Sequence, residues 1–290
     1  MDTVSEEEID LWLPLRPPPP NESPSSSDDE EIIQEIVKEV LAIQGEQFTQ
    51  DVHYSWEIVG EGRFGVCKKV IVTTNRDPVT VCIKTAKYSQ GVNEIPVLQR
   101  AKERNITQIV GLHVGKLIGR KAVICMEYMP GGTLKEYVKE GRRLSEETCT
   151  AFGKDLFLAV KFLHEEVGVI HGDIHASNVL LDEHRTYVKL ADLGSAQAIQ
   201  EDRPRCFDDI WQIGCVLLFM LNGATSLLFY ENDPDEEKRM EAVNPEEHFP
   251  PSRSASREVL KLLNLNFGVG RKQLPSAAEI LRDATIFNQK

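Results

Sequence analysis

Three short segments contain residues whose types and spacing suit phosphate chemistry. The first places Gly60, Gly62 and Gly65 directly before Val66. Glycines allow backbone N–H groups to approach phosphate oxygens. A similar glycine pattern opens dinucleotide-binding folds, but a helix follows it there, whereas the β-branched run 66–72 predicts a strand here. We therefore expect a phosphate-covering loop between two antiparallel strands.

The second segment is the apolar run Val81-Cys82-Ile83, which ends at Lys84. A lysine at the end of a strand is usually a solvated strand terminus. Because this lysine follows a glycine loop, we expect it to be the cation that binds the phosphates of a nucleotide.

The third segment spans residues 169–194 and carries three polar residues between apolar pairs: Asp173, Asn178 and Asp192. Magnesium in proteins is held by few carboxylates together with phosphate oxygens, which suits Asn178 and Asp192. Asp173 then remains to accept a proton from a hydroxyl group. Each residue alone could belong to a turn, but the ordered set favours a phosphotransfer site.

In this order and spacing, the three segments resemble the protein kinase family from about residue 54 to the end of the chain. The resemblance implies an α+β, two-lobed fold with a cleft: a β-rich N-lobe (54–126), a hinge (127–132) and a helical C-lobe (133–290). It also implies ATP and Mg²⁺ as cofactors and a protein as substrate or signalling partner. Within the family, the MAP kinase kinase kinase type is the most similar.

The resemblance also implies roles for individual residues. Lys84 contacts the ATP phosphates, Asp173 is the catalytic base, and Asn178 and Asp192 bind the metal. The helix partner of Lys84 is Glu94 or, because Pro96 lies close to it, Glu103. The remaining residues implied to bind ATP are Gly60, Gly62, Gly65, Val66, Cys82, Met126, Glu127, Met129 and Leu180.

Two substitutions depart from the family pattern. Gly172 stands where the family has the Arg that pairs with a phosphorylated activation loop, so we do not expect that form of control. His175 stands where the family has a catalytic-loop Lys, and an imidazole carries little charge at pH 7. If the loss resembles removal of an oxyanion-hole donor, it costs about 2–4 kcal/mol of transition-state stabilisation.

The interval from Asp192 to Asp209 is also short, at 17 residues, and it holds no Ala-Pro-Glu triplet. The activation and peptide-docking segment is therefore expected to be mostly missing, through a genuine deletion or through a splicing or gene-model error. Leu274 stands where the family has the Arg that pairs with the Glu of that triplet, which favours a genuine deletion.

Three functions remain open. The first is a weak or atypical Ser/Thr protein kinase, and the second is a pseudokinase scaffold that regulates partners through contacts. The third, an ATP-dependent enzyme acting on small molecules, has no specific support.

Composition limits the remaining possibilities. The chain has 290 residues, of which 41% are hydrophobic, and a formal charge of −13, which argues against a nucleic-acid binder. Its six cysteines form no CxxC pair, which indicates a reducing compartment. We find no signal peptide and no membrane-length apolar run, so a soluble, cytoplasmic protein is expected.

The start of the chain differs from the rest. Residues 1–30 are rich in Pro, Ser and acidic residues, which predicts a disordered tail, with Ser26 or Ser27 as a candidate phosphorylation site. Apolar residues at helical spacing then predict an amphipathic helix over residues 31–45, packed on the following domain.

Overall fold

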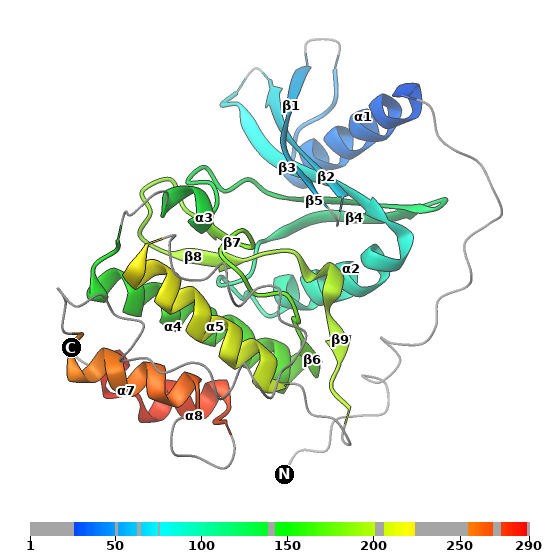
Figure 1. The fold of residues 1–290 in the computed structure, drawn as a ribbon. Helices are drawn as coiled ribbons and strands as arrows, with labels where there is room; N and C mark the ends of the chain where they lie inside the picture. The colour runs from blue at the N-terminus through cyan, green and yellow to red at the C-terminus, as the bar shows by residue number, and fades with distance from the viewer. Residues whose placement is uncertain are drawn as a thin grey trace. The chain divides into compact units, whose positions relative to one another are not determined.

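The computed structural model describes residues 26–49, 52–62, 65–74, 76–138, 143–200, 206–223, 255–268 and 274–288 (Figure 1). The chain divides into two compact units. The first contains the residues up to Asn105, Val110–Tyr128 and Asp192–Ser195; the second contains Ile106–Ile109, Met129–Ala191 and the residues from Ala196 onward. Most of the predicted tail and the tip of the glycine loop at residues 63–64 lie outside the described residues.

The first unit is built on a five-stranded antiparallel sheet in the order β1-β2-β3-β5-β4. Its strands are β1 (His53–Gly62), β2 (Gly65–Thr73), β3 (Val79–Lys87), β4 (Leu112–Ile118) and β5 (Lys121–Glu127). The second unit is mostly helical, so the predicted α+β class is confirmed.

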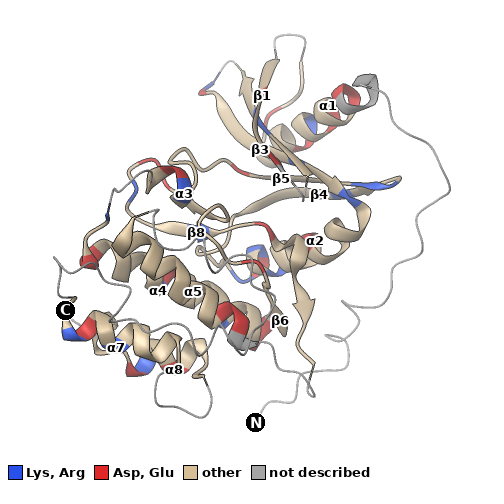
Figure 2. Cartoon of the chain, viewed as in Figure 1, with Lys and Arg blue, Asp and Glu red and all other residues tan. Residues whose placement is uncertain are grey.

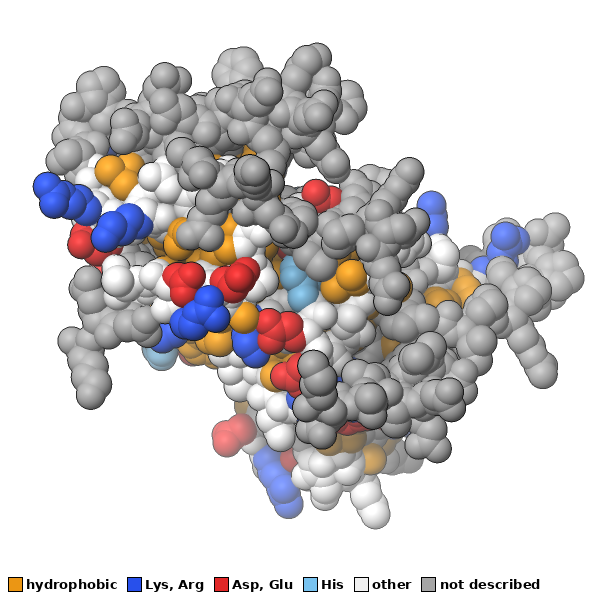
Figure 3. All heavy atoms as spheres, turned by 90° about the horizontal axis from the view of Figure 1, so that it is seen from below, with side chains coloured by type: hydrophobic (Ala, Val, Ile, Leu, Met, Phe, Trp, Pro, Cys, Tyr) orange, Lys and Arg blue, Asp and Glu red, His pale blue; other side chains and the backbone are white. Residues whose placement is uncertain are grey.

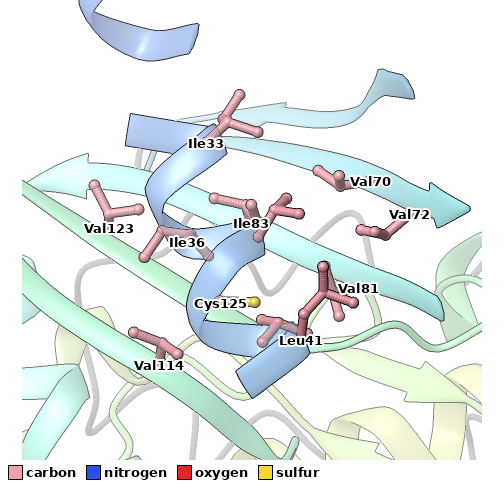
Figure 4. Packing of buried hydrophobic residues seen from close by; sticks show 12 residues of the cluster. Ile33, Ile36, Leu41, Val70, Val72, Val81, Ile83, Val114, Val123 and Cys125 are labelled. Atoms are coloured by element: carbon pink, nitrogen blue, oxygen red, sulfur yellow. The ribbon is translucent and has the colours of Figure 1, made fainter. Parts of the chain in front are cut away.

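Helix α1 (Ser26–Ile43) covers one face of the sheet (Figure 4). Its apolar stripe, which includes Ile33, Ile36 and Leu41, packs on Val70, Ile83 and their neighbours from β2 to β5. The helix begins five residues before the predicted start at residue 31 and ends at Ile43 rather than 45. The Ser-Asp-Glu run counted as tail is chemically suited to a helix N-terminus, where acidic residues offset the helix dipole.

Helix α2 (Tyr88–Glu103) lies on the other face of the sheet, the face that carries Lys84. Gly91 brings the helix so close to β5 that a Cβ at this position would lie 2.0 Å from the Cβ of Ala122. Pro96 lies inside the helix, where it cannot donate the hydrogen bond to the preceding turn. The helix nevertheless continues to Glu103, which keeps Glu94 in regular helical geometry.

The second unit contains the helices α3 (Leu134–Tyr137), α4 (Glu146–Phe162), α5 (Cys206–Asn222), α7 (Arg257–Asn266) and α8 (Ala277–Asp283). A π-helical turn, Leu163–Val167, follows α4, and a 3₁₀ turn, Thr285–Asn288, follows α8. Two short strand pairs complete it: β6 (Val169–Ile170) pairs with β9 (Gln197–Ala198), and β7 (Val179–Leu181) pairs with β8 (Val188–Leu190).

Apolar packing holds this unit together. Edge-to-face aromatic contacts join Phe157 to Phe287 and Trp211 to Phe267. Of the helices in the described part of the chain, none is both long and apolar enough to span a membrane.

Charged side chains tie α1 to the edge of the sheet. Lys116 on β4 lies 2.7 Å from Glu35 and also contacts Glu39, one helical turn further along α1. Figure 2 colours the charged positions along the chain, α1 and β4 included. Elsewhere on the surface, acidic and basic side chains of the described residues lie next to one another (Figure 3).

Candidate functional site

Lys84 is the centre of a charged cluster in the first unit. Its Nζ lies 2.7 Å from Glu94 Oε2 and 2.7 Å from Asp192 Oδ1. Lys84 is 3% exposed and Glu94 is fully buried. Of the two partners expected from the sequence, the structure therefore places Glu94 beside Lys84, while Glu103 lies 3.8 Å from Arg100.

The cluster keeps the lysine charged. Burial alone would lower the pKa of Lys84, but the carboxylates of Glu94 and Asp192 outweigh that effect and raise it. Burial raises the pKa of Glu94, and the opposing attraction of Lys84 does not fully offset this. A fixed ammonium group beside a solvent-reachable carboxylate is suited to binding phosphate oxygens.

Asp192 is held in an unusual backbone conformation. Its φ of 64° lies in the left-handed region, which costs a non-glycine residue about 1–2 kcal/mol. Its Oδ1 accepts the amide of Gly194 at 3.3 Å as well as the Lys84 contact. Since both contacts use Oδ1, the described residues leave Oδ2 able to bind a cation.

In the second unit, Asp173, His175 and Asn178 lie within one short loop. Asn178 Nδ2 donates to the carbonyl of Asp173 at 2.9 Å and lies 3.4 Å from its Oδ2 and 3.3 Å from His175 Nε2. His175 Nδ1 accepts the amide of Ser177, which directs Nε2 towards Asp173 Oδ1 at 3.6 Å. The amide orientation of Asn178 leaves its oxygen as the group that can bind a metal.

Each unit separately holds one oxygen donor of a kind that magnesium accepts. Among the described residues, no three His, Cys, Asp or Glu side chains gather into a metal site of their own. Magnesium with ATP does not need such a site, because phosphate oxygens and water supply most of its ligands. One carboxylate oxygen of Asp192 and one amide oxygen of Asn178 are the type of donors required.

Helix α5 fixes the backbone of the Asp173 loop. The buried carboxylate of Asp209 accepts the amides of His171 and Gly172, both at 2.8 Å, and lies 2.8 Å from His164 Nε2. Gln212, one turn further along α5, accepts the amide of Ile174 at 2.8 Å.

These positioning roles of Asp209, Gln212 and His164 were not predicted from the sequence. The available signal was a carboxylate in the first turn of a mostly apolar helix, because a buried carboxylate needs hydrogen-bond donors.

The register of the sheet decides which residues of β2 share the face of Lys84. Val66 pairs with Thr85, and Cys67 pairs with Lys84. Side chains alternate along a strand, so Cys67 shares the face of Lys84, while Val66 shares the face that α1 covers. The nucleotide contact expected for Val66 stays a prediction, and the register makes Cys67 the β2 residue on the face of Lys84.

Several other residues predicted to bind ATP lie on or directly after strands β3, β5 and β7. Cys82 on β3 pairs with Met126 on β5, two residues before Lys84 and on the same face. Glu127 is held by a mutual pair of bonds with Gly111, whose amide donates to Glu127 Oε1 at 2.6 Å and whose carbonyl accepts the Glu127 amide at 2.9 Å. In the second unit, the carbonyl of Met129 accepts the amide of Gly132, and Leu180 lies on β7.

The structure thus brings together two groups of predicted residues, each within its own unit: Lys84, Glu94 and Asp192 in the first, and Asp173, His175 and Asn178 in the second.

Comparison with known proteins adds a family match. The family model described as "Protein kinase domain" matches residues 54–208, which is more than half of the chain. A probable serine/threonine-protein kinase of Dictyostelium discoideum is 25% identical over 80% of this chain and 50% of its own length. Serine/threonine-protein kinase Nek8 of Danio rerio is 27% identical over 56% of this chain and 27% of its own length. Ribosomal protein S6 kinase alpha-4 of Homo sapiens is 25% identical over 57% of this chain and 24% of its own length. The chain therefore spans half or less of the length of these curated relatives.

Proposed function

Because the chain belongs to the protein kinase family, we propose that it binds Mg-ATP and transfers the γ-phosphoryl group to a serine or threonine of a protein substrate. One observation carries the proposal. Lys84, buried and charged, contacts Glu94 and Asp192 at 2.7 Å each, which is the charge arrangement that phosphate binding requires.

Each residue has a separate task in the proposed reaction. Lys84 binds phosphate oxygens, and Glu94 holds the ammonium group in place. Asp192 and Asn178 would hold magnesium, which would offset the charge of the phosphate groups. Asp173 orients the attacking hydroxyl group and accepts its proton. The reaction relies mainly on positioning and electrostatics, so the spatial arrangement of these side chains matters more than the reactivity of any one of them.

Binding and transfer need separate tests. Mg-ATP should raise the thermal unfolding temperature of the chain, and Lys84→Ala or Asp192→Asn should abolish the shift. Radiolabelled phosphate should pass from ATP to the chain itself or to a generic protein, and Asp173→Asn should abolish transfer without abolishing the ATP shift. Glu183→Gln, an exposed carboxylate in the second unit, is the matched control and should leave both signals unchanged.

A pseudokinase scaffold is the second candidate. It is favoured by His175, which replaces the permanent cation of the family, and by the short interval between Asp192 and Asp209. Leu274, in the place of the family's Arg, is buried, as an apolar replacement for a lost ion pair should be. Mg-ATP binding with no phosphate transfer by the wild-type chain would establish this second function and exclude the first.

The closer assignment within the family is also a proposal. The sequence around His171, Gly172 and Asp173, the short spacing from Lys84 to Glu94 and the helix before the domain resemble NF-kappa-B-inducing kinase. Phosphorylation of downstream kinases by the purified chain is the corresponding test.

A further inference from the structure

Cys67 and Cys82 are neighbours on one face of the sheet in the first unit. In the β2–β3 register, Cys67 lies opposite Lys84, and Cys82 lies opposite Lys69, so the two cysteines are diagonal neighbours. Both project from the face that carries Lys84, because side chains alternate along a strand. Both are free and half-buried, and hydrogen bonding between the two thiols shifts both pKa values.

The two thiols differ in acidity. The hydrogen bond with Cys82 lowers the pKa of Cys67; burial opposes this, and the charge of Lys84 lowers it further. The same hydrogen bond, together with burial, raises the pKa of Cys82. Cys67 is therefore the more readily ionised sulfur, and Cys82 is a protonated thiol directly beside it, the arrangement of a reactive and a resolving cysteine.

The other cysteines whose side chains the structure describes lack these features. Cys125, one residue before Met126, projects from the opposite face into the core beneath α1, and burial raises its pKa to about 12. Cys149 is buried in α4. Cys215, half-buried in the second unit, provides a comparison thiol on a different element.

We propose that Cys67 and Cys82 form a reversible redox pair that is oxidised by peroxides to a disulfide beside Lys84. The Cys67 thiolate attacks one peroxide oxygen, an S–O bond forms, the O–O bond breaks, and hydroxide leaves. The Cys82 sulfur then attacks the Cys67 sulfur, so that an S–S bond forms, the S–O bond breaks, and water departs with the Cys82 proton. A small-molecule thiol such as glutathione reverses the step by two successive exchanges.

The geometry makes this bond reducible. Diagonal neighbours have Cα atoms about 7–8 Å apart, slightly beyond the range of about 4.4–6.8 Å that a disulfide spans. Closing the bond therefore requires a local backbone shift of about 1 Å in β2 and β3. A strained disulfide is reduced more easily than a relaxed one, which suits a reversible modification.

The consequence for ATP rests on the proposed function. The bond would join β2 to β3 just after the glycine loop and would change the surface beside Lys84. We therefore expect oxidation to weaken Mg-ATP binding, and bound ATP to protect both thiols. At an ATP concentration ten times its Kd, about a tenth of the chains have an empty site, so the oxidation rate should fall about tenfold.

The test uses the full chain, treated with hydrogen peroxide after removal of reductant. Tryptic mapping without reduction should show the peptide Phe64–Lys68 linked to Asp77–Lys84, with loss of two hydrogens. Dithiothreitol should separate the peptides and restore the Mg-ATP thermal shift. Cys67→Ser and Cys82→Ser should each abolish the linked peptide, whereas Cys215→Ser should leave it unchanged.

The outcomes separate the two proposals. The redox pair beside the nucleotide would be overturned if Cys67 and Cys82 both stayed alkylatable after peroxide treatment. It would also be overturned if the linked peptide formed equally fast in a chain saturated with Mg-ATP. A linked peptide in a chain whose reduced form shows no Mg-ATP shift would keep the redox pair and overturn the proposed function.

Discussion

Replacing Glu94 with glutamine tests the charged cluster most directly. Glu94→Gln keeps the size of the side chain but removes the negative charge that faces Lys84 at 2.7 Å. Removing one partner of a buried ion pair costs about 3–5 kcal/mol. Lys84 keeps Asp192 at 2.7 Å, and the glutamine amide oxygen can still accept a hydrogen bond. We therefore expect a loss of about 2 kcal/mol of folding free energy, or about 4–8 °C in Tm.

The same variant should weaken ATP binding. Without Glu94, the ammonium group of Lys84 is held by Asp192 alone, the carboxylate that is proposed to bind the metal. We expect Mg-ATP affinity to fall about tenfold, equal to about 1.4 kcal/mol. Isothermal titration with Mg-ATP measures the affinity, and thermal unfolding measures the stability.

Glu103→Gln is the matched control, in the same helix. Glu103 lies 3.8 Å from Arg100, and its side chain is 54% exposed. An exposed ion pair of this kind contributes at most about 1 kcal/mol, and ATP affinity should not change. Equal effects of the two substitutions on ATP affinity would refute the assignment of Glu94 as the partner of Lys84.

Three further substitutions, the first with a matched control, test the packing and hydrogen bonding inside each unit. Ile36→Ala removes a fully buried side chain of α1 and should destabilise the chain by about 2–5 kcal/mol in urea unfolding. Ile43→Ala, at a position 59% exposed on the same helix, should change stability by less than about 0.5 kcal/mol. Gly91→Ala should cost about 1–3 kcal/mol, because the new methyl group overlaps Ala122; an unchanged Tm would show that α2 is not packed as described. Burial opposes ionisation of Asp182, but hydrogen bonds from three backbone amides and one hydroxyl group hold its pKa below the usual value. A depressed pKa gives stability that is present above the unfolded pKa of about 3.9 and lost as the pH falls through the folded value. Asp182→Asn should therefore be less stable than wild type at pH 7, and the difference should disappear at the acid end of a pH series.

The residues proposed to do chemistry were largely readable from the sequence, because their types and order are dictated by phosphate chemistry. Lys84, Asp173 and Asp192 each follow an apolar run in the sequence. In the structure Lys84 lies within β3, and Asp173 and Asp192 lie in the loops that follow β6 and β8. The choice between Glu94 and Glu103 was not decidable from spacing, since Pro96 suggested a helix break that the tertiary packing overrides.

Two features could not be read from the sequence, because strand pairing is set by the partner strand. The face of Val66 depends on its register against β3, and a shift of one residue moves every side chain to the other face. Strand β4 was not predicted, because His113, Gly115 and Lys116 interrupt its apolar pattern. In the structure it pairs with β5, and Gly115 lets Ile95 of α2 pack against it.

The loop that carries Asp173 shows how such a site can be ordered without a phosphorylated activation loop. The backbone of the loop is held by Asp209 and Gln212, which belong to a buried helix of the same unit. Gly172 has a φ of 77° and donates its backbone amide to Asp209. A glycine has no side chain that could bind a phosphate group. Since Gly172 carries no cation, we do not expect a phosphorylated activation loop to order the Asp173 loop through this position. A chain of this design, when it transfers phosphate, is expected to do so without that form of control, and the proposed redox pair Cys67 and Cys82 offers another means of regulation.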